Sequence, residues 1–203
     1  QQAAAPPAAD YEKVRRGGQY GFVAILLDLI GIAVTLVSRA AGMVVGLVAL
    51  VLLLLALRDL SDALGEPRIF SYGVYALVVS LAGALVALVA AAGAVLTVGP
   101  AGLAGAALGA LAAVLAATYV VVVVVGYLMN RIYDMLSERT APLSARASED
   151  FGRAARWYWI GVLLVVILVG VALVIVGQVY ALMGFRELES VSPPAAGQGS
   201  QVI

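Results

Sequence analysis

The stretch "ALRDLSDALGEPRIFSYGVY" (residues 56–75) decides how this chain folds. It places two arginines and three carboxylates between two long apolar runs, residues 42–57 and about 72–98. An α-helix rises about 1.5 Å per residue, so about 20 apolar residues cross a hydrocarbon core of about 30 Å. Gly65 and Pro67 lie where one helix should end and the next begin. The stretch therefore predicts a charged joint between two membrane helices at the bilayer surface.

The composition of the whole chain also indicates that lipid is its solvent. Of the 203 residues, 64% are hydrophobic and only 12% are charged, whereas a soluble domain is about half apolar and a quarter charged. So few charges cannot cover a surface that faces water. The formal net charge is zero, which leaves no basic excess for binding nucleic acid. We expect a multi-pass protein of the cell membrane, with the lipid bilayer as a partner and no nucleic acid.

Cysteine and histidine are both absent from the chain. Their absence excludes disulfides, thiolate nucleophiles, zinc clusters, histidine-ligated haem and serine–histidine triads. An enzyme would have to use carboxylates, arginine, tyrosine or serine, and the sequence contains no phosphate loop or nucleotide fingerprint. We therefore expect no enzymatic activity, no cofactor, no metal site and no catalytic residue.

Five apolar segments are long enough, or nearly so, to cross a bilayer. They are residues 20–37, 42–57, about 72–98, about 103–128 and about 157–185. Inside lipid the backbone polar groups must pair within each segment, so we expect helices, even at the six consecutive valines before Gly126. The predicted fold class is all-α, a polytopic membrane bundle of about five transmembrane helices.

The two ends of the chain differ in composition from the apolar segments. Residues 1–19, "QQAAAPPAADYEKVRRGGQ", are rich in Ala and Pro and predict a flexible arm with a basic anchor. Residues 189–203 predict a flexible tail, so the transmembrane domain is expected over 20–188. Because the chain starts at Gln1 instead of methionine, we expect processing, trimming or excision from a longer product.

Lysine and arginine are distributed unevenly between the two predicted sides of the membrane. The arm has three, the link 58–71 has two and the link 129–156 has five, whereas the other side has Arg39 and Arg186. Basic residues near spans favour the cytoplasmic side, so we expect the N-terminus inside and the C-terminus outside. An alternative for the first span is a secretory signal, because "SRA" after an apolar run resembles a cleavage site.

Asp28, in "FVAILLDLIGIAV", is the only formal charge inside a predicted span. A charge at mid-membrane costs about 3 kcal/mol on insertion scales, so such a group is a functional candidate, for example as a proton site. The alternative is a structural carboxyl that faces the bundle or a partner subunit. A relay needs a chain of polar groups, and the sequence does not assemble one. The other polar residues of the spans are Thr35, Ser80, Thr97, Thr118, Tyr119 and Gln178.

Small residues recur at helical spacing and predict close helix packing. Helices in lipid associate where small residues let their backbones approach. The third and fourth spans should therefore form a tight antiparallel hairpin, although each pair could instead mark contact with another subunit. We expect a homo-oligomer or an assembly with other membrane proteins. The predicted packing pairs are Gly42 with Gly46, Gly83 with Ala87, and Gly105 with Gly109.

The charged joint has its own candidate residues. Arg58, Asp59, Asp62 and Phe70 are assigned to a cytoplasmic joint. Paired carboxylates are able to hold a divalent metal or transfer protons, but each acid here has an arginine within reach, as expected of a charged helix end.

The link at 128–151 repeats features of this joint. Asp134-Met-Leu136 aligns with Asp62-Ala-Leu64, and a phenylalanine precedes the next span in both. The match indicates either an internal duplication or chance.

Two stretches carry a resemblance to a known family. "ALRDLSDALGEPRIFSYGVYALV" (56–78) and "EDFGRAARWYWIGVLLVVILVGVALVIVGQVYALMGFREL" (149–188) resemble a family of small archaeal integral membrane proteins of unknown function, of the DUF996 type. The resemblance covers about residues 20–190. It implies a multi-span fold and an archaeal origin, and it implies no activity and no catalytic residues.

Two functions fit these observations best, and a membrane enzyme comes third because its polar groups would have to lie in the links 58–71 and 129–156. The first is a non-enzymatic scaffold or accessory subunit of a membrane assembly, because packing residues are abundant and catalytic groups are few. The alternative is a small transporter or channel that uses Asp28, whose substrate the sequence does not specify.

Overall fold

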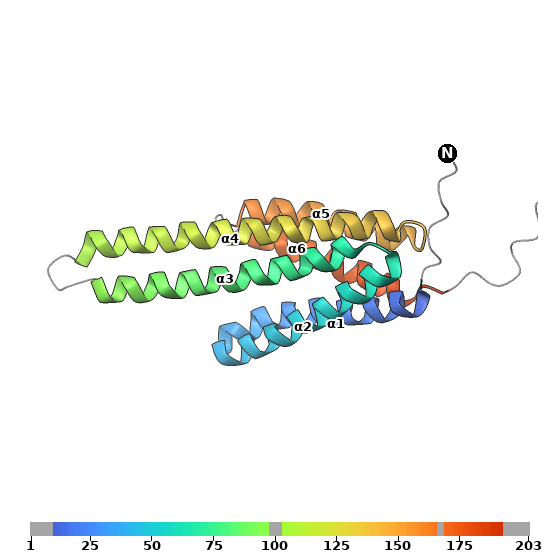
Figure 1. The fold of residues 1–203 in the computed structure, drawn as a ribbon, viewed down its shortest axis with the longest axis horizontal. Helices are drawn as coiled ribbons and strands as arrows, with labels where there is room; N and C mark the ends of the chain where they lie inside the picture. Colours follow the sequence, from blue (N-terminus) through green and yellow to red (C-terminus); the bar gives the residue numbers. More distant parts are fainter. Residues whose placement is uncertain (1–9, 98–102, 166–168, 193–203) are drawn as a thin grey trace, which may run out of the picture.

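The computed structural model describes residues 10–97, 103–165 and 169–192, and all of its regular structure there is helical. The predicted all-α class is confirmed. Within these described residues, six helices run back and forth along one direction (Figure 1). They are α1 (Tyr11–Val37), α2 (Arg39–Leu64), α3 (Pro67–Thr97), α4 (Leu103–Thr140), α5 (Ala145–Leu163) and α6 (Val169–Glu189).

Side chains and turn residues fix where the helices begin and end. Asp10 caps α1 by accepting a hydrogen bond from the backbone N–H of Lys13 at 3.2 Å. Gly65, at φ 64°, ends α2 in the left-handed conformation that glycine adopts without strain. Pro67 is the first residue of α3. The predicted stop and restart at the charged joint are therefore confirmed.

Two helix starts differ from the predictions. Helix α1 begins at Tyr11, inside the stretch predicted to be a flexible arm, because Asp10 supplies its cap. The fifth span was predicted to begin at about residue 157, whereas helix α5 begins at Ala145 and is capped by Ser144, which accepts from the N–H of Ala147 at 3.2 Å.

In the described part of the chain, five of the six helices are long and apolar enough to cross a membrane, namely α1, α2, α3, α4 and α6. Helices α3 and α4 lie side by side and antiparallel, as predicted (Figure 1). Their predicted turn, residues 99–102, lies outside the described part of the chain.

The fifth predicted span, residues 157–185, is wrong as a single helix. Helix α5 ends at Leu163, and α6 begins at Val169 and runs back along it. One helix of that length would extend about 40 Å, beyond the hydrocarbon core. Glycines allow the two backbones to touch instead, since a Cβ added at Gly177 would lie 2.7 Å from the backbone N of Tyr158. The run contains glycines but no Pro, Asn or Asp, and glycines spread along an apolar helix do not show where it breaks.

The additional helix corrects the predicted placement of the two ends. The start of α1 and the end of α6 lie together, where Gln19 Nε2 donates to Glu189 Oε1 at 3.3 Å. The N-inside, C-outside arrangement is therefore wrong for the helical part of the chain. We call this end of the bundle, with the starts of α1, α3 and α5, the charged end.

Nearly all basic residues lie toward the charged end. Of the twelve lysines and arginines, only Arg39 lies at the opposite end, where α2 begins. The others are Lys13, Arg15, Arg16, Arg58, Arg68, Arg131, Arg139, Arg146, Arg153, Arg156 and Arg186.

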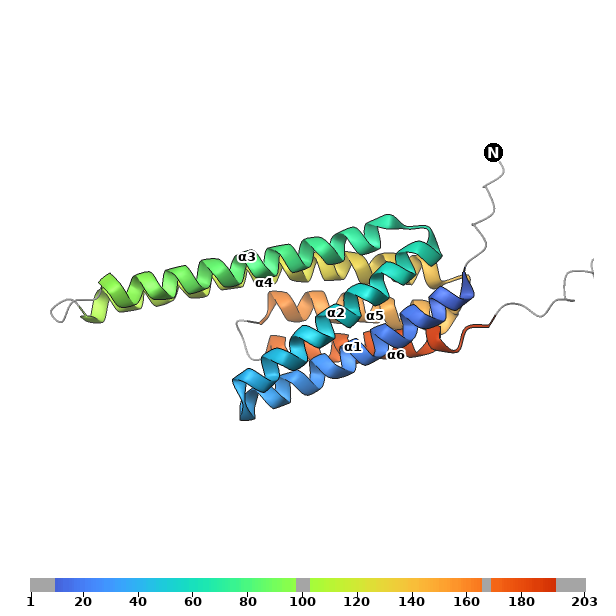
Figure 2. The same cartoon turned by 60° about the horizontal axis from the view of Figure 1, so that its bottom comes forward.

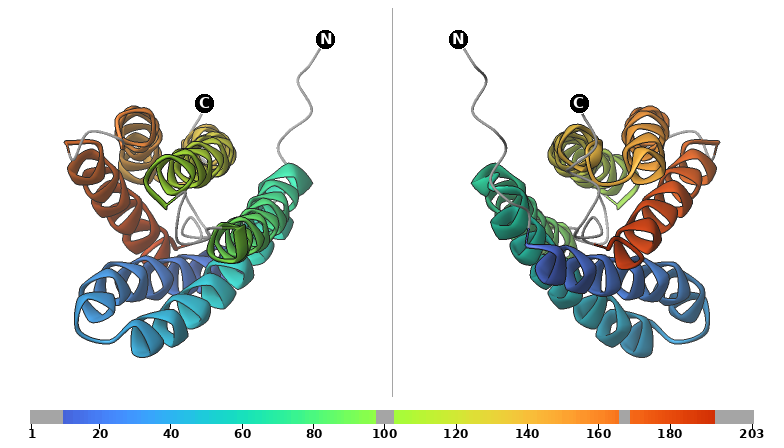
Figure 3. Two further views of the ribbon diagram at one scale, coloured as in Figure 1. Left: turned by 90° about the vertical axis from the view of Figure 1, so that its left-hand side faces the viewer. Right: turned by 90° about the vertical axis from the view of Figure 1, so that its right-hand side faces the viewer.

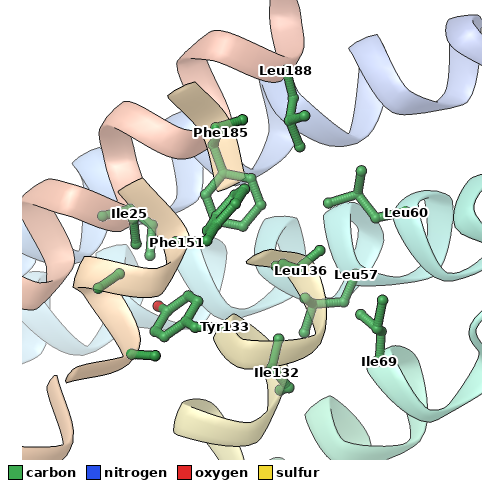
Figure 4. Packing of buried hydrophobic residues seen from close by; sticks show 14 of the residues in the cluster. Ile25, Leu57, Leu60, Ile69, Ile132, Tyr133, Leu136, Phe151, Phe185 and Leu188 are labelled. Carbon is green, nitrogen blue, oxygen red and sulfur yellow. The ribbon is translucent and has the colours of Figure 1, made fainter. Parts of the chain in front are cut away.

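The helices form a closed ring in the order α1, α6, α5, α4, α3 and α2 (Figure 3). The contact between α2 and α3 is the least extensive of the six that close this ring. Near the charged end a dense core fills the ring, with the Phe151 and Phe185 rings edge to face at 5.1 Å and Tyr133 stacked at 6.4 Å from Phe151 (Figure 4). Away from it, α3 and α4 diverge from the other helices and extend past them as a two-helix arm (Figure 2).

Candidate functional site in the helix ring

A cavity of about 330 Å³, here called the central cavity, lies inside the ring beside the dense core and is lined by residues of all six helices. Most of its lining is aliphatic. Five of its residues carry polar side-chain atoms, and they come from five different helices. They are Asp28, Ser80, Tyr133, Tyr158 and Gln178.

Asp28 of α1 and Gln178 of α6 form a hydrogen-bonded pair in this cavity. Gln178 Nε2 donates to Asp28 Oδ2 at 2.6 Å, across 150 positions of sequence. Gln178 is only 8% exposed, and its buried Oε1 accepts no hydrogen bond from any described residue. A buried acceptor without a donor costs about 1–3 kcal/mol, so this oxygen requires an explanation.

Helical periodicity directs both side chains inward. On α6 the buried positions include Gly177, Gln178, Ala181 and Phe185, which fall on one face at spacings of three and four residues. On α1, Asp28 follows the buried Ala24 at the same spacing. Each polar residue therefore takes a core position of its helix.

Two tyrosines complete the polar part of the cavity. The rings of Tyr133 (α4) and Tyr158 (α5) meet edge to face with centroids 5.9 Å apart. Tyr133 is 1% exposed and stacked on Phe151, so its position is rigid. Ser80 donates to the carbonyl of Ala76 at 2.8 Å, which leaves its oxygen as an acceptor.

The charge balance of the cavity is one-sided. Its described lining contains the carboxyl group of Asp28 and no lysine or arginine. An ionised carboxylate in this position accepts one hydrogen bond, from Gln178, and has no positively charged side chain beside it in the described lining. The site is therefore suited to a proton or a mobile cation and disfavours an anion.

The acids of the predicted joint are paired with other helices. Asp59 accepts two hydrogen bonds from Arg16 of α1, at 2.6 Å from Nε and 2.9 Å from Nη2. Asp62 lies 3.6 Å from Lys13 Nζ, so its partner is a lysine of α1 and not one of the arginines expected within reach. Glu66 accepts from Nη2 of Arg139 at 2.6 Å. These pairs tie α2 and the α2–α3 link to α1 and α4.

The acidic residues of the described chain do not form a metal site. Among residues 10–97, 103–165 and 169–192, no three acidic side chains gather in a group that could hold a metal ion.

The two links with similar sequences pack differently at their phenylalanines. Phe151 is fully buried, whereas Phe70 is partly buried and packs against the core.

Asp150 at the charged end is a buried acid that the sequence did not single out. It is 7% exposed on α5. Burial raises the pKa of this carboxyl, and Arg153 opposes the shift only in part.

The predicted packing residues have different surroundings. A Cβ at Gly42 would lie 2.8 Å from Thr35 Cα of α1, and one at Gly83 would lie 2.6 Å from Val121 Cγ1 of α4. Gly46, which lines the central cavity, and Gly109 have no described atom within 4 Å of an added Cβ. The side-chain surroundings of Ala87 and Gly105 lie outside the described part of the chain.

Helices α1 and α6 pack most closely at two glycines that the sequence pattern did not single out. A Cβ at Gly21 would lie 2.6 Å from Cγ of Phe185, and one at Gly18 would lie 2.8 Å from the backbone O of the same residue. The signal that could have revealed this contact is Gly18-x-x-Gly21, two small residues on one helix face, whereas the neighbouring Gly17 faces α2, where an added Cβ would lie 2.8 Å from Cγ of Leu60.

The fold and the cavity define a polytopic α-helical protein with a polar centre inside an apolar bundle. A family model described as "Protein of unknown function (DUF996)" matches residues 43–179, more than half of the chain. The chain belongs to this family, and the expected resemblance is confirmed. Asp28 lies outside the matched residues, whereas Gln178 lies inside them.

A curated relative extends the comparison. "Uncharacterized protein MJ1644" of Methanocaldococcus jannaschii is 25% identical over 161 residues, which cover 78% of this chain and 88% of the relative. No solved structure matches the chain.

Proposed function

We propose that the protein is a small transporter or channel of the cell membrane that moves a positively charged solute, with Asp28 as the residue that holds it. The observation that carries this proposal is the Asp28–Gln178 pair on the wall of the central cavity. A carboxyl group inside apolar helices is costly, and such groups commonly mark pathways of ions and protons.

The position of the cavity in the ring supports a gated pathway. On the side of the charged end it is bounded by the dense core, in which Leu57, Leu60 and Leu136 are at most 1% exposed. On the other side the helices diverge (Figure 2). Transport would require this core to open. In this proposal, the structure therefore represents a state in which the pathway is closed at the charged end.

The basic residues set the proposed orientation. Eleven of the twelve lysines and arginines lie toward the charged end. Under the positive-inside rule this end faces the cytoplasm, with both ends of the helical domain on that side.

The direct test is ion flux through purified protein in liposomes. Proton, Na⁺, K⁺ and organic ammonium fluxes would be measured separately for the wild type, Asp28→Asn and Thr35→Val. Thr35 is the matched control, because it lies on the same helix but outside the lining of the central cavity. We expect at least one flux, lost in Asp28→Asn and retained in Thr35→Val. A flux that Asp28→Asn leaves unchanged would refute the role of Asp28.

A scaffold or accessory subunit is the second candidate, and the α3–α4 arm favours it. Past the rest of the ring, α3 and α4 extend together without another helix of the chain beside them (Figure 1), and Leu81, Leu85 and Leu115 on them are each 61% exposed. Leu→Ala substitutions on the arm would dissociate a homo-oligomer or a co-purifying membrane subunit if the arm is an interface. A lone monomer in native nanodiscs contradicts this candidate.

A further inference from the structure

Resting on the proposed function, we propose that the central cavity binds an organic ammonium ion with an apolar body, held by Asp28 and Gln178. The chemistry of the wall, the size of the cavity and its position against lipid each bear on this assignment.

The free acceptor oxygens of the Asp28–Gln178 pair favour a ligand with several N–H donors. Asp28 Oδ2 already accepts from Gln178, which leaves Oδ1 of the carboxylate. Gln178 Oε1 lacks a donor among the described residues. An ammonium group supplies up to three N–H donors and a positive charge, so it would neutralise the carboxylate, and it would also satisfy Gln178 Oε1 once the buried amide turns toward the cavity.

The size of the cavity argues against a bare ion. A volume of about 330 Å³ lies at the lower end of the range for small-molecule sites, about 300–1,000 Å³. A metal cation such as Ca²⁺ needs six to eight converging oxygen ligands, whereas the described lining joins only one pair of polar side chains by a hydrogen bond, Asp28 with Gln178. A proton needs no cavity.

The remaining wall suits an apolar body. Ile25, Leu50, Leu53, Leu54 and Val125 line the cavity and would bury a hydrocarbon or aromatic group. Tyr133 and Tyr158 add aromatic rings, which attract ammonium ions by cation–π interaction.

The seam between α2 and α3 provides a route from lipid. At Gly73 the helices touch, because an added Cβ would lie 2.6 Å from Cδ1 of Leu57. Farther from the charged end, Gly46 lines the cavity and has no described atom within 4 Å of an added Cβ. A ligand that partitions into the bilayer would enter here.

The competing explanation is a site for protons only. If Asp28 is protonated and the Gln178 amide is rotated by 180°, the carboxyl donates to the amide oxygen without any ligand. Tyr133 and Tyr158, from α4 and α5, are the other titratable groups of the lining, which contains no lysine or arginine. This explanation predicts an apolar cavity that does not distinguish an amine from an alcohol.

The test uses three probes of nearly equal shape: 2-phenylethylamine, 2-phenylethanol and phenylacetate. Binding to full-length protein in nanodiscs would be measured by calorimetry and by the fluorescence of Trp157 and Trp159, which flank Tyr158 and are the only tryptophans. We expect the amine to bind at least about tenfold more tightly than the alcohol, equivalent to about 1.4 kcal/mol, and the anion to bind least. Equal binding of amine and alcohol would overturn the proposal.

Variants locate the site. Asp28→Asn and Gln178→Leu should each weaken amine binding at least about tenfold, and Thr35→Val should not change it. Gly46→Leu places a side chain into the open space of the cavity and should reduce binding without loss of folding, judged by its melting temperature. Amine binding that survives both Asp28→Asn and Gly46→Leu contradicts this location.

Flux and binding separate this inference from the proposed function. Asp28-dependent flux of protons or Na⁺ without amine binding overturns the ligand assignment and leaves the transport function standing. Asp28-dependent amine binding without flux of amine or inorganic ions overturns transport and leaves the binding site. If neither Asp28-dependent flux nor Asp28-dependent amine binding is observed, both the transport function and the ligand assignment are refuted.

Discussion

Gly21→Ala should destabilise the bundle by pushing α1 away from α6. The added Cβ would lie 2.6 Å from Cγ of Phe185, whereas carbon atoms pack at about 3.5–4.0 Å, so the ring or the helix must move by about 1 Å. The ring has no space to retreat, because Phe185 is fully buried and contacts Phe151 at 5.1 Å between centroids.

The cost follows from two opposing effects. Overpacking a rigid core costs about 1–3 kcal/mol, and replacing a helical glycine with alanine returns up to about 1 kcal/mol. We expect a net loss of about 1–2 kcal/mol in the free energy of unfolding. Since Asp28 lies on the same helix and bonds to α6, the displacement should also loosen its pair with Gln178.

The assay is equilibrium unfolding in mixed micelles with increasing dodecyl sulfate, followed by tryptophan fluorescence. Gly109→Ala is the matched control, because no described atom lies within 4 Å of its added Cβ. It should be as stable as the wild type or slightly more stable. The reasoning is refuted if Gly21→Ala shows no loss, or if Gly109→Ala loses as much.

Three further predictions use the same preparations. Phe151→Ala should cost about 3–5 kcal/mol of unfolding free energy. Phe70→Ala should cost clearly less, because of these two residues Phe151 alone is fully buried. Equal losses would indicate that the two phenylalanines have equivalent structural roles, as the repeated sequence pattern of the two links suggests. Asp150, whose pKa burial raises, holds its proton more tightly in the folded state, so its stabilising effect is present at acid pH and lost as the pH rises through the raised pKa. Asp150→Asn should flatten this dependence in melting curves, and an unchanged slope would exclude Asp150 as its source. Epitope tags at the two termini should be accessible from the same side of oriented vesicles; protection of only one tag would contradict the six-helix arrangement.

The sequence by itself determined the local features of this protein. Composition and the length of the apolar runs predicted an all-α fold with five helices able to cross a membrane. Gly65 and Pro67 marked the α2–α3 joint, because the left-handed turn and the fixed φ are properties of single residues. These features depend on a residue and its chain neighbours, so a linear pattern is sufficient to find them.

Only the tertiary structure decided how the helices pair. The break of residues 157–185 into α5 and α6 depends on contact between two backbones, and it returns the end of the helical domain to the end where it started. The partner of Asp28 is Gln178, 150 residues away, one of several scattered polar groups whose meeting no spacing predicts. In a chain with 22 glycines, small-xxx-small pairs are too frequent to show that Gly21 meets Phe185. Each of these outcomes is set by which faces fit together across the ring, and that fit is a property of the packed bundle and not of any one segment.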